Sequence, residues 1–293
     1  MLKGALRRRA GAIAVVTACL AVAPAGLAGA EPAKVLFGAA STPSAEPPAP
    51  IGGYAAGCIG GAVELAETGP GWQAMRLSRN RNWGHPEAIA FIERLSHSAR
   101  ANGWAGLYIG DISQPRGGPM VSGHRSHQIG LDIDIWLRPA KTLELARADR
   151  EQLSSINVVR SDRRGVTGDW TRQHHNILRA AATDPAVARI FVNAAIKQAL
   201  CDAEPADADR DWLARIRPWW GHDAHFHVRL ACPNGAGECQ PQDPVPAGDG
   251  CGDELAWWFS DEALNPKPSD KPTRPREITL ADLPQACSAV IAR

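Results

Sequence analysis

The chain has 293 residues and a formal net charge of +1 at pH 7, so it can form one large domain or two small ones with a substantial core. This near-neutral charge provides no electrostatic basis for binding nucleic acid or an anionic lipid surface. We therefore expect no polyanionic partner.

The first 30 residues have the pattern of an export signal. Lys3 and Arg7–Arg9 form a positive start, an apolar stretch of small residues runs from Ala10 to Leu27, and Ala28–Ala30 matches an A-x-A cleavage site. The pattern predicts a signal peptide over residues 1–30 that is removed after export.

The same segment has two other interpretations, a membrane anchor and a lipoprotein signal. A membrane anchor is disfavoured because Ala and Gly dilute the apolar stretch and no stop-transfer pattern follows. Val16–Cys19 resembles a lipoprotein cleavage box, but apolar residues continue past Cys19, which favours the later cut. No other segment is long and apolar enough to span a bilayer, so we expect no stable membrane span.

The cysteines agree with export. The chain has seven, and Cys19 would leave with the signal peptide. An even number of thiols in an oxidising compartment predicts disulfides, and six cysteines allow 15 pairings. A structural zinc site is the alternative, but the chain has no C-x-x-C pair. The six remaining cysteines are Cys58, Cys201, Cys232, Cys239, Cys251 and Cys287.

In chain order, the proline-rich residues 31–50 predict an extended, solvated lead-in to a single domain over residues 51–293. Apolar residues at helical spacing predict a helix over Pro86–Ala101, followed by a strand over Trp104–Ile112. Gln114–Gly123 has the glycine and proline content of a loop.

The next segments mix strands and helices. Leu131–Leu137 alternates with period two, which places Asp132 and Asp134 on the face opposite the leucines and isoleucines. Helices are predicted over residues 169–183, 193–200 and 209–217, with a strand over residues 189–192. His225–Leu230 alternates again, and Pro-rich residues 265–276 predict a loop or arm. Helices and antiparallel-looking strands in this order predict an α+β domain.

Five of the nine histidines fall in two short clusters, His124 with His127 and His222 with His225 and His227. Zinc prefers imidazole nitrogen and carboxylate oxygen, and catalytic zinc sites use three protein ligands and leave one position to water. If the strands that carry Asp134 and His227 are neighbours, these two side chains and His127 converge on one side of the sheet. The sequence therefore predicts a zinc site.

Each of these signals has a simpler explanation when taken alone. A histidine on a strand is usually structural, an aspartate beside another usually belongs to a solvated face, and H-x-H and H-x6-D spacings are common. Their combination in an exported chain favours the metal site.

Other polar groups share the expected metal face. His225 can act as a general base or stabilise a developing oxyanion, and His222 can orient the attacking water. Asp132 is expected to hydrogen-bond a ligand imidazole. Arg125 and Arg229 can bind a substrate carboxylate or form salt bridges. A serine nucleophile is disfavoured because the chain has neither G-x-S-x-G nor S-x-x-K.

At these residues the chain resembles a known group. His127–Asp134 followed by His225–His227 is similar to the H-x6-D and H-x-H signatures of the LAS metallopeptidases, which include lysostaphin-type endopeptidases, D-alanyl-D-alanine dipeptidases and penicillin-insensitive murein endopeptidases. Longer strings resemble the last family, and the resemblance covers about residues 53–287. These strings are Gly123–Gln128, Ala188–Asn193, Ile196–Gln198, Ala224–Leu230 and Gly248–Gly252.

The resemblance implies a periplasmic zinc endopeptidase whose partner is peptidoglycan (murein). It would hydrolyse the D-alanyl–meso-diaminopimelyl cross-link, with an L,D-type cross-link as a further possible substrate, and β-lactams would not inhibit it. The implied fold is a small antiparallel sheet flanked by helices, with long disulfide-tied loops.

Carried over residue by residue, the resemblance makes His127, Asp134 and His227 the zinc ligands and His222 and His225 their catalytic neighbours. It also associates His124 and Asp162 with metal, as a second and weaker site. The family histidine just after Asp162 is missing here, which argues against a second metal. The resemblance implies the disulfides Cys58–Cys287, Cys201–Cys251 and Cys232–Cys239.

Two alternative functions remain open at this point. A D,D-carboxypeptidase or dipeptidase on the same scaffold would need a pocket for a terminal carboxylate, whereas an enzyme that cuts cross-links needs an open groove. A metal-bearing murein-binding module without activity is the non-enzymatic alternative, although an intact ligand set and His225 argue against it.

Overall fold

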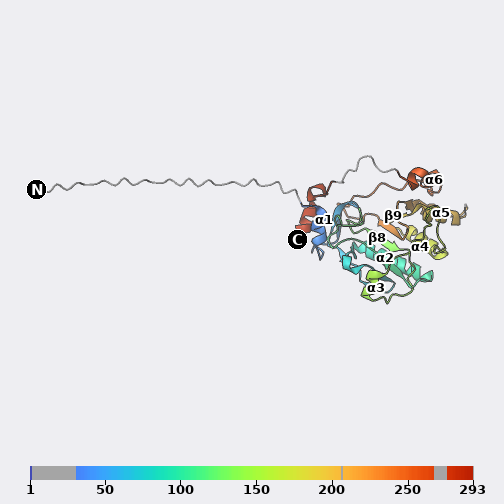
Figure 1. The fold of residues 1–293 in the computed structure, drawn as a ribbon, viewed down its shortest axis with the longest axis horizontal. Coiled ribbons are helices and arrows are strands. Elements are labelled where there is room, and N and C mark those ends of the chain that lie inside the picture. The colour runs from blue at the N-terminus through green and yellow to red at the C-terminus, as the bar shows by residue number, and fades with distance from the viewer. Residues whose placement is uncertain (2–30, 206, 267–275, 293) are drawn as a thin grey trace. The chain divides into compact units, whose positions relative to one another are not determined.

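Figure 1 shows the fold in the computed structural model, which describes residues 31–205, 207–266 and 276–292 together with Met1. The described residues from Glu31 onward belong to one compact unit. Apart from Met1, the predicted export signal lies outside the described residues, as does most of the predicted arm at 265–276. No helix in the described ranges has the length and apolarity needed to cross a membrane.

The centre of the fold is a seven-stranded mixed sheet. Its strand order is β10-β9-β11-β8-β7-β5-β4. β9, β11, β8 and β7 pair antiparallel, while β10 runs parallel to β9 and β5 runs parallel to β7. The α+β class is confirmed, and the sheet is larger than predicted and not purely antiparallel. Its strands are β4 (Thr68–Gly69), β5 (Trp72–Ala74), β7 (Leu107–Ile109), β8 (Asp132–Trp136), β9 (Val187–Val192), β10 (Ile216–Pro218) and β11 (His225–Leu230).

Two short two-stranded sheets and a set of helices complete the described part of the chain. The short sheets are β1 (Ala49–Gly53) with β2 (Ala56–Gly60) and β3 (Val63–Glu64) with β6 (Trp83–Gly84). The helices are α1 (Ala33–Ala39), α2 (Pro86–Ala101), α3 (Arg147–Gln152), α4 (Arg172–Thr183), α5 (Ala194–Ala203), α6 (Asp253–Trp257), α7 (Asp261–Leu264) and α8 (Ala286–Ala292). The 3-10 turns are η1 (Leu77–Arg79), η2 (Asp211–Arg215) and η3 (Leu280–Asp282).

Helix α2 has the predicted bounds because its sequence contains its own start signal. Pro86 is its first residue, and the ring nitrogen Nδ1 of His85 accepts a hydrogen bond from the backbone N–H of Glu87 at 3.2 Å. Phe91 and Leu95 on its buried face join the main core. By contrast, the helix predicted over 209–217 is only the turn η2, since Ile216 pairs with β9 as the first residue of β10.

The segment 31–50 differs from the predicted extended lead-in. It contains α1, whose residues Ala33 and Phe37 lie four apart on one face and are fully buried. They pack in a small cluster with Cys58, Cys287 and other apolar residues of both chain ends. Local composition did not reveal this helix because several of its apolar partners, including Cys287 and Val290, lie more than 200 residues further along the chain.

All three disulfide pairings implied by the resemblance are confirmed. Cys58 is bonded to Cys287, Cys201 to Cys251, and Cys232 to Cys239. The first joins β2 to α8, and the second joins α5 to the segment that leads into α6. The first two bonds tie C-terminal segments to earlier elements of the chain, and the third closes a short loop after β11.

The two central strands separate a core face from a polar face, as their alternation predicts. Ile133 and Ile135 of β8, with Phe226 and Val228 of β11, are buried in the main core together with apolar residues of α2 and α4. The residues between them point to the other side of the sheet. That side holds the two histidine clusters.

Candidate metal centre

The pairing of β8 with β11 brings the two distant polar segments together. The strands are antiparallel, and His227 lies directly opposite Asp134 in the register. Antiparallel partners on one face have their side chains about 5 Å apart, close enough to share one ion. The expectation that these strands are neighbours is confirmed.

His127 joins this pair from the loop that enters β8. Its backbone has a φ of 67°, a left-handed conformation that is costly for a residue with a Cβ. The carboxylate of Asp132 stabilises this conformation, because its Oδ2 accepts a hydrogen bond from the His127 backbone N–H at 2.9 Å. The imidazole is fully buried and points at the β8–β11 pair.

Three donor atoms converge at this point. The Nε2 of His127 lies 3.2 Å from the Nδ1 of His227, and each of these nitrogens lies 3.3 Å from the Oδ1 of Asp134. His124 approaches the same carboxylate, with its Nε2 3.5 Å from Asp134 Oδ2. The ligand atoms of His124, His127 and Asp134 all lie within 4.8 Å of one another, as a metal-binding group requires.

In the rings of His127 and His227, the nitrogen that points away from the converging atoms donates a hydrogen bond. The other nitrogen, which faces inward, therefore carries the lone pair. His127 donates through Nδ1 to the carbonyl oxygen of Ile112 at 2.6 Å, and His227 donates through Nε2 to Asp132 Oδ1 at 2.8 Å. In the neutral imidazoles, His127 Nε2 and His227 Nδ1 therefore both carry lone pairs. Two lone pairs and a carboxylate oxygen that face one another form a site for a cation.

The oxygen at the centre of the group has no hydrogen bond of its own. Asp134 Oδ1 is buried without a hydrogen-bond partner, although imidazole nitrogens of His127, His225 and His227 lie 3.3, 3.6 and 3.3 Å away. A buried carboxylate oxygen without a partner is costly unless a cation or proton satisfies it. The donor set therefore fits a metal such as zinc, which selects imidazole and carboxylate ligands.

The electrostatics of the group also favour a cation. Burial disfavours the imidazolium of His227, but the negative charges of Asp132 and Asp134 outweigh burial and raise the pKa of His227 to about 9. Burial likewise opposes ionisation of Asp134, yet the neighbouring histidines His225 and His127 hold its pKa well below the usual range. A metal ion would compete with a proton for the same inward-facing atoms.

Asp132 accepts hydrogen bonds from His127 and His227 on the side that faces away from the converging donor atoms. It is fully buried and binds His127 and His227 through its two oxygens, and its Oδ1 also accepts a hydrogen bond from Arg229 Nε at 2.8 Å. The positive charge of Arg229 outweighs the effect of burial and lowers the pKa of Asp132. Arg229 thus forms a buried ion pair inside the protein, and Arg125 is exposed.

Sequence reasoning missed Asp111, which holds His124. Its Oδ2 lies 3.0 Å from His124 Nε2 and accepts a hydrogen bond from Arg81 at 2.9 Å. Burial opposes ionisation of Asp111, but these hydrogen bonds outweigh it and lower its pKa to about 2. The one available signal was an aspartate near the end of the predicted strand Trp104–Ile112, which alone is common.

His225 and His222 lie beside the group of donors. His225 is half-buried, with its Nε2 3.6 Å from Asp134 Oδ1, and the rings of His222 and His225 are 5.0 Å apart. His222 donates through Nδ1 to the carbonyl oxygen of Trp220 at 2.9 Å, which leaves Nε2 as an acceptor. Burial, aided by the charge of His225, lowers the pKa of His222 to about 4, so this ring is neutral at pH 7.

Asp162 has other contacts. It is exposed, its two carboxylate oxygens accept hydrogen bonds from the guanidinium of Arg160 at 3.2 and 2.9 Å, and the backbone N–H of Arg164 donates to it at 2.9 Å. These arginine contacts lower the pKa of Asp162. It is not part of the metal-binding group found among the described residues.

Comparison with known proteins finds similar sequences over most of the chain. Residues 50–292 match the family described as penicillin-insensitive murein endopeptidase. Proteins of that name are 47% identical over 230 residues in Haemophilus influenzae, covering 78% of this chain and 77% of the relative, and 44% identical over 253 residues in Yersinia enterocolitica, covering 85% and 87%. A Klebsiella pneumoniae protein of the same name is 44% identical over 245 residues, covering 82% and 85%.

Proposed function

Since this chain belongs to the family of penicillin-insensitive murein endopeptidases, we propose that it is a zinc-dependent peptidase that hydrolyses D-alanyl–meso-diaminopimelyl cross-links in peptidoglycan. The observation that carries the proposal is the convergence of His127 Nε2, His227 Nδ1 and Asp134 Oδ1 at 3.2–3.3 Å from one another. Three protein ligands with one open position are typical of catalytic zinc sites.

In the proposed mechanism, His127, Asp134 and His227 hold the ion and His124 lies next to them. When bound there, zinc supplies Lewis-acid activation of a water molecule at neutral pH. His225 takes up a proton during the attack, or as imidazolium stabilises the charge that develops on the carbonyl oxygen of the scissile peptide. His222 accepts a hydrogen bond through Nε2 and thereby orients the water.

The proposed location is the periplasm. Three disulfides require an oxidising compartment to form and persist, which agrees with the export signal in the sequence. The reaction needs no acylated serine, so β-lactams, which acylate serine enzymes, are expected not to inhibit it.

The test is a digest of purified murein with and without a chelator, combined with elemental analysis of the purified protein. We expect zinc in the protein and release of monomers from cross-linked muropeptide dimers, both lost on chelation. Loss of terminal D-alanine without cleavage of dimers would instead indicate the carboxypeptidase alternative. Binding of zinc and murein without turnover would indicate the inactive module.

Replacing His127 tests the ligand assignment. His127→Ala should lose zinc and reduce cross-link hydrolysis by more than about 100-fold, because a lost ligand costs more than a lost hydrogen bond to a ligand. The matched control is His97→Ala, which removes an exposed histidine of α2 and should retain both. Full activity in His127→Ala would reject the assignment.

Asp162 remains in the proposal as a ligand of a second and weaker site. If it binds metal, Asp162→Asn lowers the number of zinc ions bound per chain at saturating zinc. An unchanged stoichiometry would remove it from the site.

A further inference from the structure

Four tryptophans form one continuous aromatic cluster beside the candidate metal centre. Trp219 and Trp220 follow β10, Trp257 ends α6, and Trp258 follows it. The ring centroid of Trp220 lies 5.7 Å from that of Trp219, 6.1 Å from that of Trp257 and 4.5 Å from that of Trp258. We call these four residues the tryptophan surface.

Three of these indoles are in contact with solvent. Trp219 is 49% exposed, Trp220 48% and Trp257 42%, and every other tryptophan within the described ranges is buried or half-buried. Exposed apolar side chains scattered singly need no explanation, but a contiguous group of this size marks a binding site. Indole is also the side chain most enriched where a surface binds a partner.

The tryptophan surface is held rigidly. Trp220 donates through Nε1 to the carbonyl oxygen of Ala263 at 3.3 Å, and Arg164 donates to the carbonyl oxygen of Phe259 at 3.0 Å. Trp258 packs beside Leu255 in a small apolar cluster that also contains both cysteines of the Cys201–Cys251 disulfide. A preformed surface binds with little loss of conformational entropy.

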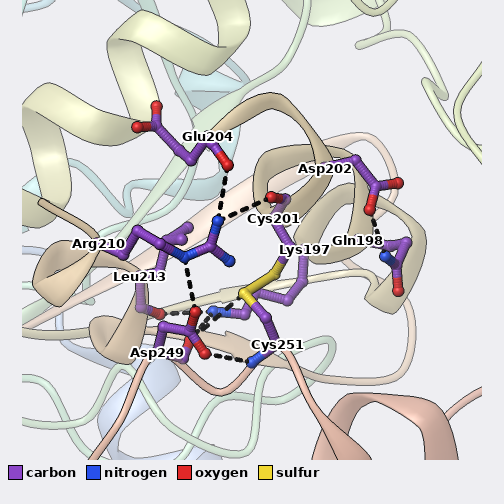
Figure 2. Close-up of a disulfide and its surroundings, with 9 residues drawn as sticks. All are labelled: Lys197, Gln198, Cys201, Asp202, Glu204, Arg210, Leu213, Asp249 and Cys251. Carbon is purple, nitrogen blue, oxygen red and sulfur yellow. Dashed lines mark hydrogen bonds and ion pairs between the residues drawn. A yellow bond between two sulfur atoms is a disulfide. The ribbon is translucent and has the colours of Figure 1, made fainter. Parts of the chain in front are cut away.

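Figure 2 shows how the chain is fixed just before α6. Cys251 is bonded to Cys201 of α5, and Lys197 of the same helix donates to the carbonyl oxygens of Asp249 and Leu213 at 2.5 and 2.7 Å. Arg210 pairs with the Asp249 carboxylate at 2.7 Å. The segment that carries Trp257 and Trp258 is therefore anchored at the base of α6.

The tryptophan surface is continuous with the metal centre through one side chain. Phe191 of β9 has its ring 5.3 Å from that of His227 and 5.8 Å from that of Trp219. The same phenylalanine lies 6.3 Å from the ring of His222. A polymer whose cross-link lies at the metal centre would thus meet the indoles on the same face of the protein.

The charges around the tryptophan surface favour a neutral ligand. α6 and α7 begin with Asp253, Glu254, Asp261 and Glu262, all exposed. Arg217 and Glu254 neutralise each other as an ion pair. The three remaining acidic residues outnumber the nearby guanidinium groups of Arg163 and Arg164. An acidic border repels anionic lipid and the free carboxylates of peptides.

We propose that the tryptophan surface binds the glycan strand of murein by stacking its indoles on N-acetylated hexosamine rings, a proposal that rests on murein being the substrate. The C–H-bearing face of a pyranose is apolar and its rim is polar, which suits the flat indole with its single N–H donor. A stem peptide of three or four extended residues spans roughly 10–14 Å, so a cross-link in the metal centre has its sugars close by. Glycan binding then presents the cross-link for cleavage.

The first test measures sugar binding without hydrolysis. Tryptophan fluorescence is titrated with peptide-free murein glycan strands and with an N-acetylglucosamine tetramer, using the full-length purified protein. Trp220→Ala and Trp257→Ala should each weaken binding by roughly fivefold, the loss of about one stacked aromatic contact. Trp257→Phe should recover part of the lost affinity. Ile278→Ala, at an exposed apolar residue outside the tryptophan surface, should leave the affinity for sugar unchanged. Trp219 is kept intact because it contacts Phe191 beside the histidines.

The second test compares kcat/KM on intact murein with kcat/KM on a cross-linked peptide dimer that lacks sugars. In Trp257→Ala, kcat/KM on murein divided by kcat/KM on the peptide dimer should fall roughly fivefold, because KM on murein rises. If the wild-type protein cleaves neither substrate but binds the sugar tetramer through Trp257, the proposed function fails and the glycan site stands. The glycan site is overturned if the wild type does not bind sugar, if the alanine variants bind it equally well, or if binding is found instead to anionic vesicles.

Discussion

At the scale of single residues, the candidate centre depends on one aspartate that does not face the converging donor atoms. Asp132 orients His127 and His227, the two histidines proposed as ligands, through separate oxygens and is itself neutralised by Arg229. Such a hydrogen bond fixes the tautomer and the direction of a ligand imidazole. The affinity of the site for metal should therefore respond to Asp132 even though it supplies no ligand atom.

Asp132→Asn tests this role. The amide keeps the shape of the side chain but removes the charge that favours donation from His227 and leaves the buried guanidinium of Arg229 without its counter-ion. We expect zinc affinity, measured by competition with a chromophoric chelator, to fall about 10–100-fold. Asp169→Asn, at an exposed position, is the matched control. Unchanged zinc affinity in a folded Asp132→Asn protein would contradict this role.

The candidate ligands of the centre could be predicted from sequence, but the residues that position His124 could not. Period-two alternation places Asp134 and His227 on the polar faces of their strands, and chemistry names them as ligands. Asp111 and Arg81 lie on other segments, and only the folded chain brings them to His124. Neither residue has a local pattern that distinguishes it from a surface charge.

At the scale of elements, the junction between α5 and the chain that leads into α6 contains a buried lysine. Lys197 is completely buried, and its ammonium donates to two backbone carbonyls without a direct carboxylate partner. Burial lowers the pKa of Lys197 to about 7. The neutral amine still has two N–H donors, so both hydrogen bonds persist when it loses its proton.

The pH dependence of stability reports on this lysine. Between about pH 7 and its ordinary pKa of 10.5, the unfolded chain holds a proton on Lys197 that the folded chain has released. The free energy of unfolding therefore gains up to about 1.4 kcal/mol per pH unit as the pH rises through this window. Urea unfolding at pH 7, 8 and 9 should show this rise in the wild type relative to Lys197→Met. Lys141→Met, at an exposed lysine, should follow the wild type, and parallel curves for all three proteins would refute the burial effect.

Elements with internal signals were predictable, and those that depend on distant partners were not. α2 carries its own proline start and an apolar face of five buried residues, so its bounds follow from local sequence. α1 has only seven residues and two buried side chains, and its partners include Cys287 and Val290 of the C-terminal α8. A short helix is unstable alone, and tertiary packing decides whether it forms.

At the scale of the whole molecule, the three disulfides differ most in the length of chain that they close. The sequence separations are 229 residues for Cys58–Cys287, 50 for Cys201–Cys251 and 7 for Cys232–Cys239. A longer closed loop restricts the unfolded chain more, so its bond stabilises the fold more. The bond between the two ends of the domain should therefore contribute the most.

Paired substitutions test this order. Chain-entropy arguments predict that Cys58→Ala with Cys287→Ala lowers the free energy of unfolding by about 5 kcal/mol, and Cys232→Ala with Cys239→Ala by about 2–3 kcal/mol. Urea unfolding of both double variants beside the wild type provides the comparison. Equal losses, or a larger loss at the short loop, would show that packing at each bond outweighs loop length.

The amino-acid sequence by itself determined the α+β class and the alternating strands, named histidines and aspartates suited to zinc as candidates, and carried a resemblance that paired the cysteines correctly. It could do so because periodicity and residue type are local properties. Only the tertiary structure decided the direct opposition of His227 and Asp134, the support from Asp111, and the seven-stranded extent of the sheet. It also gathered Trp219 and Trp220 with Trp257 and Trp258, because contacts between distant segments arise only when the chain packs.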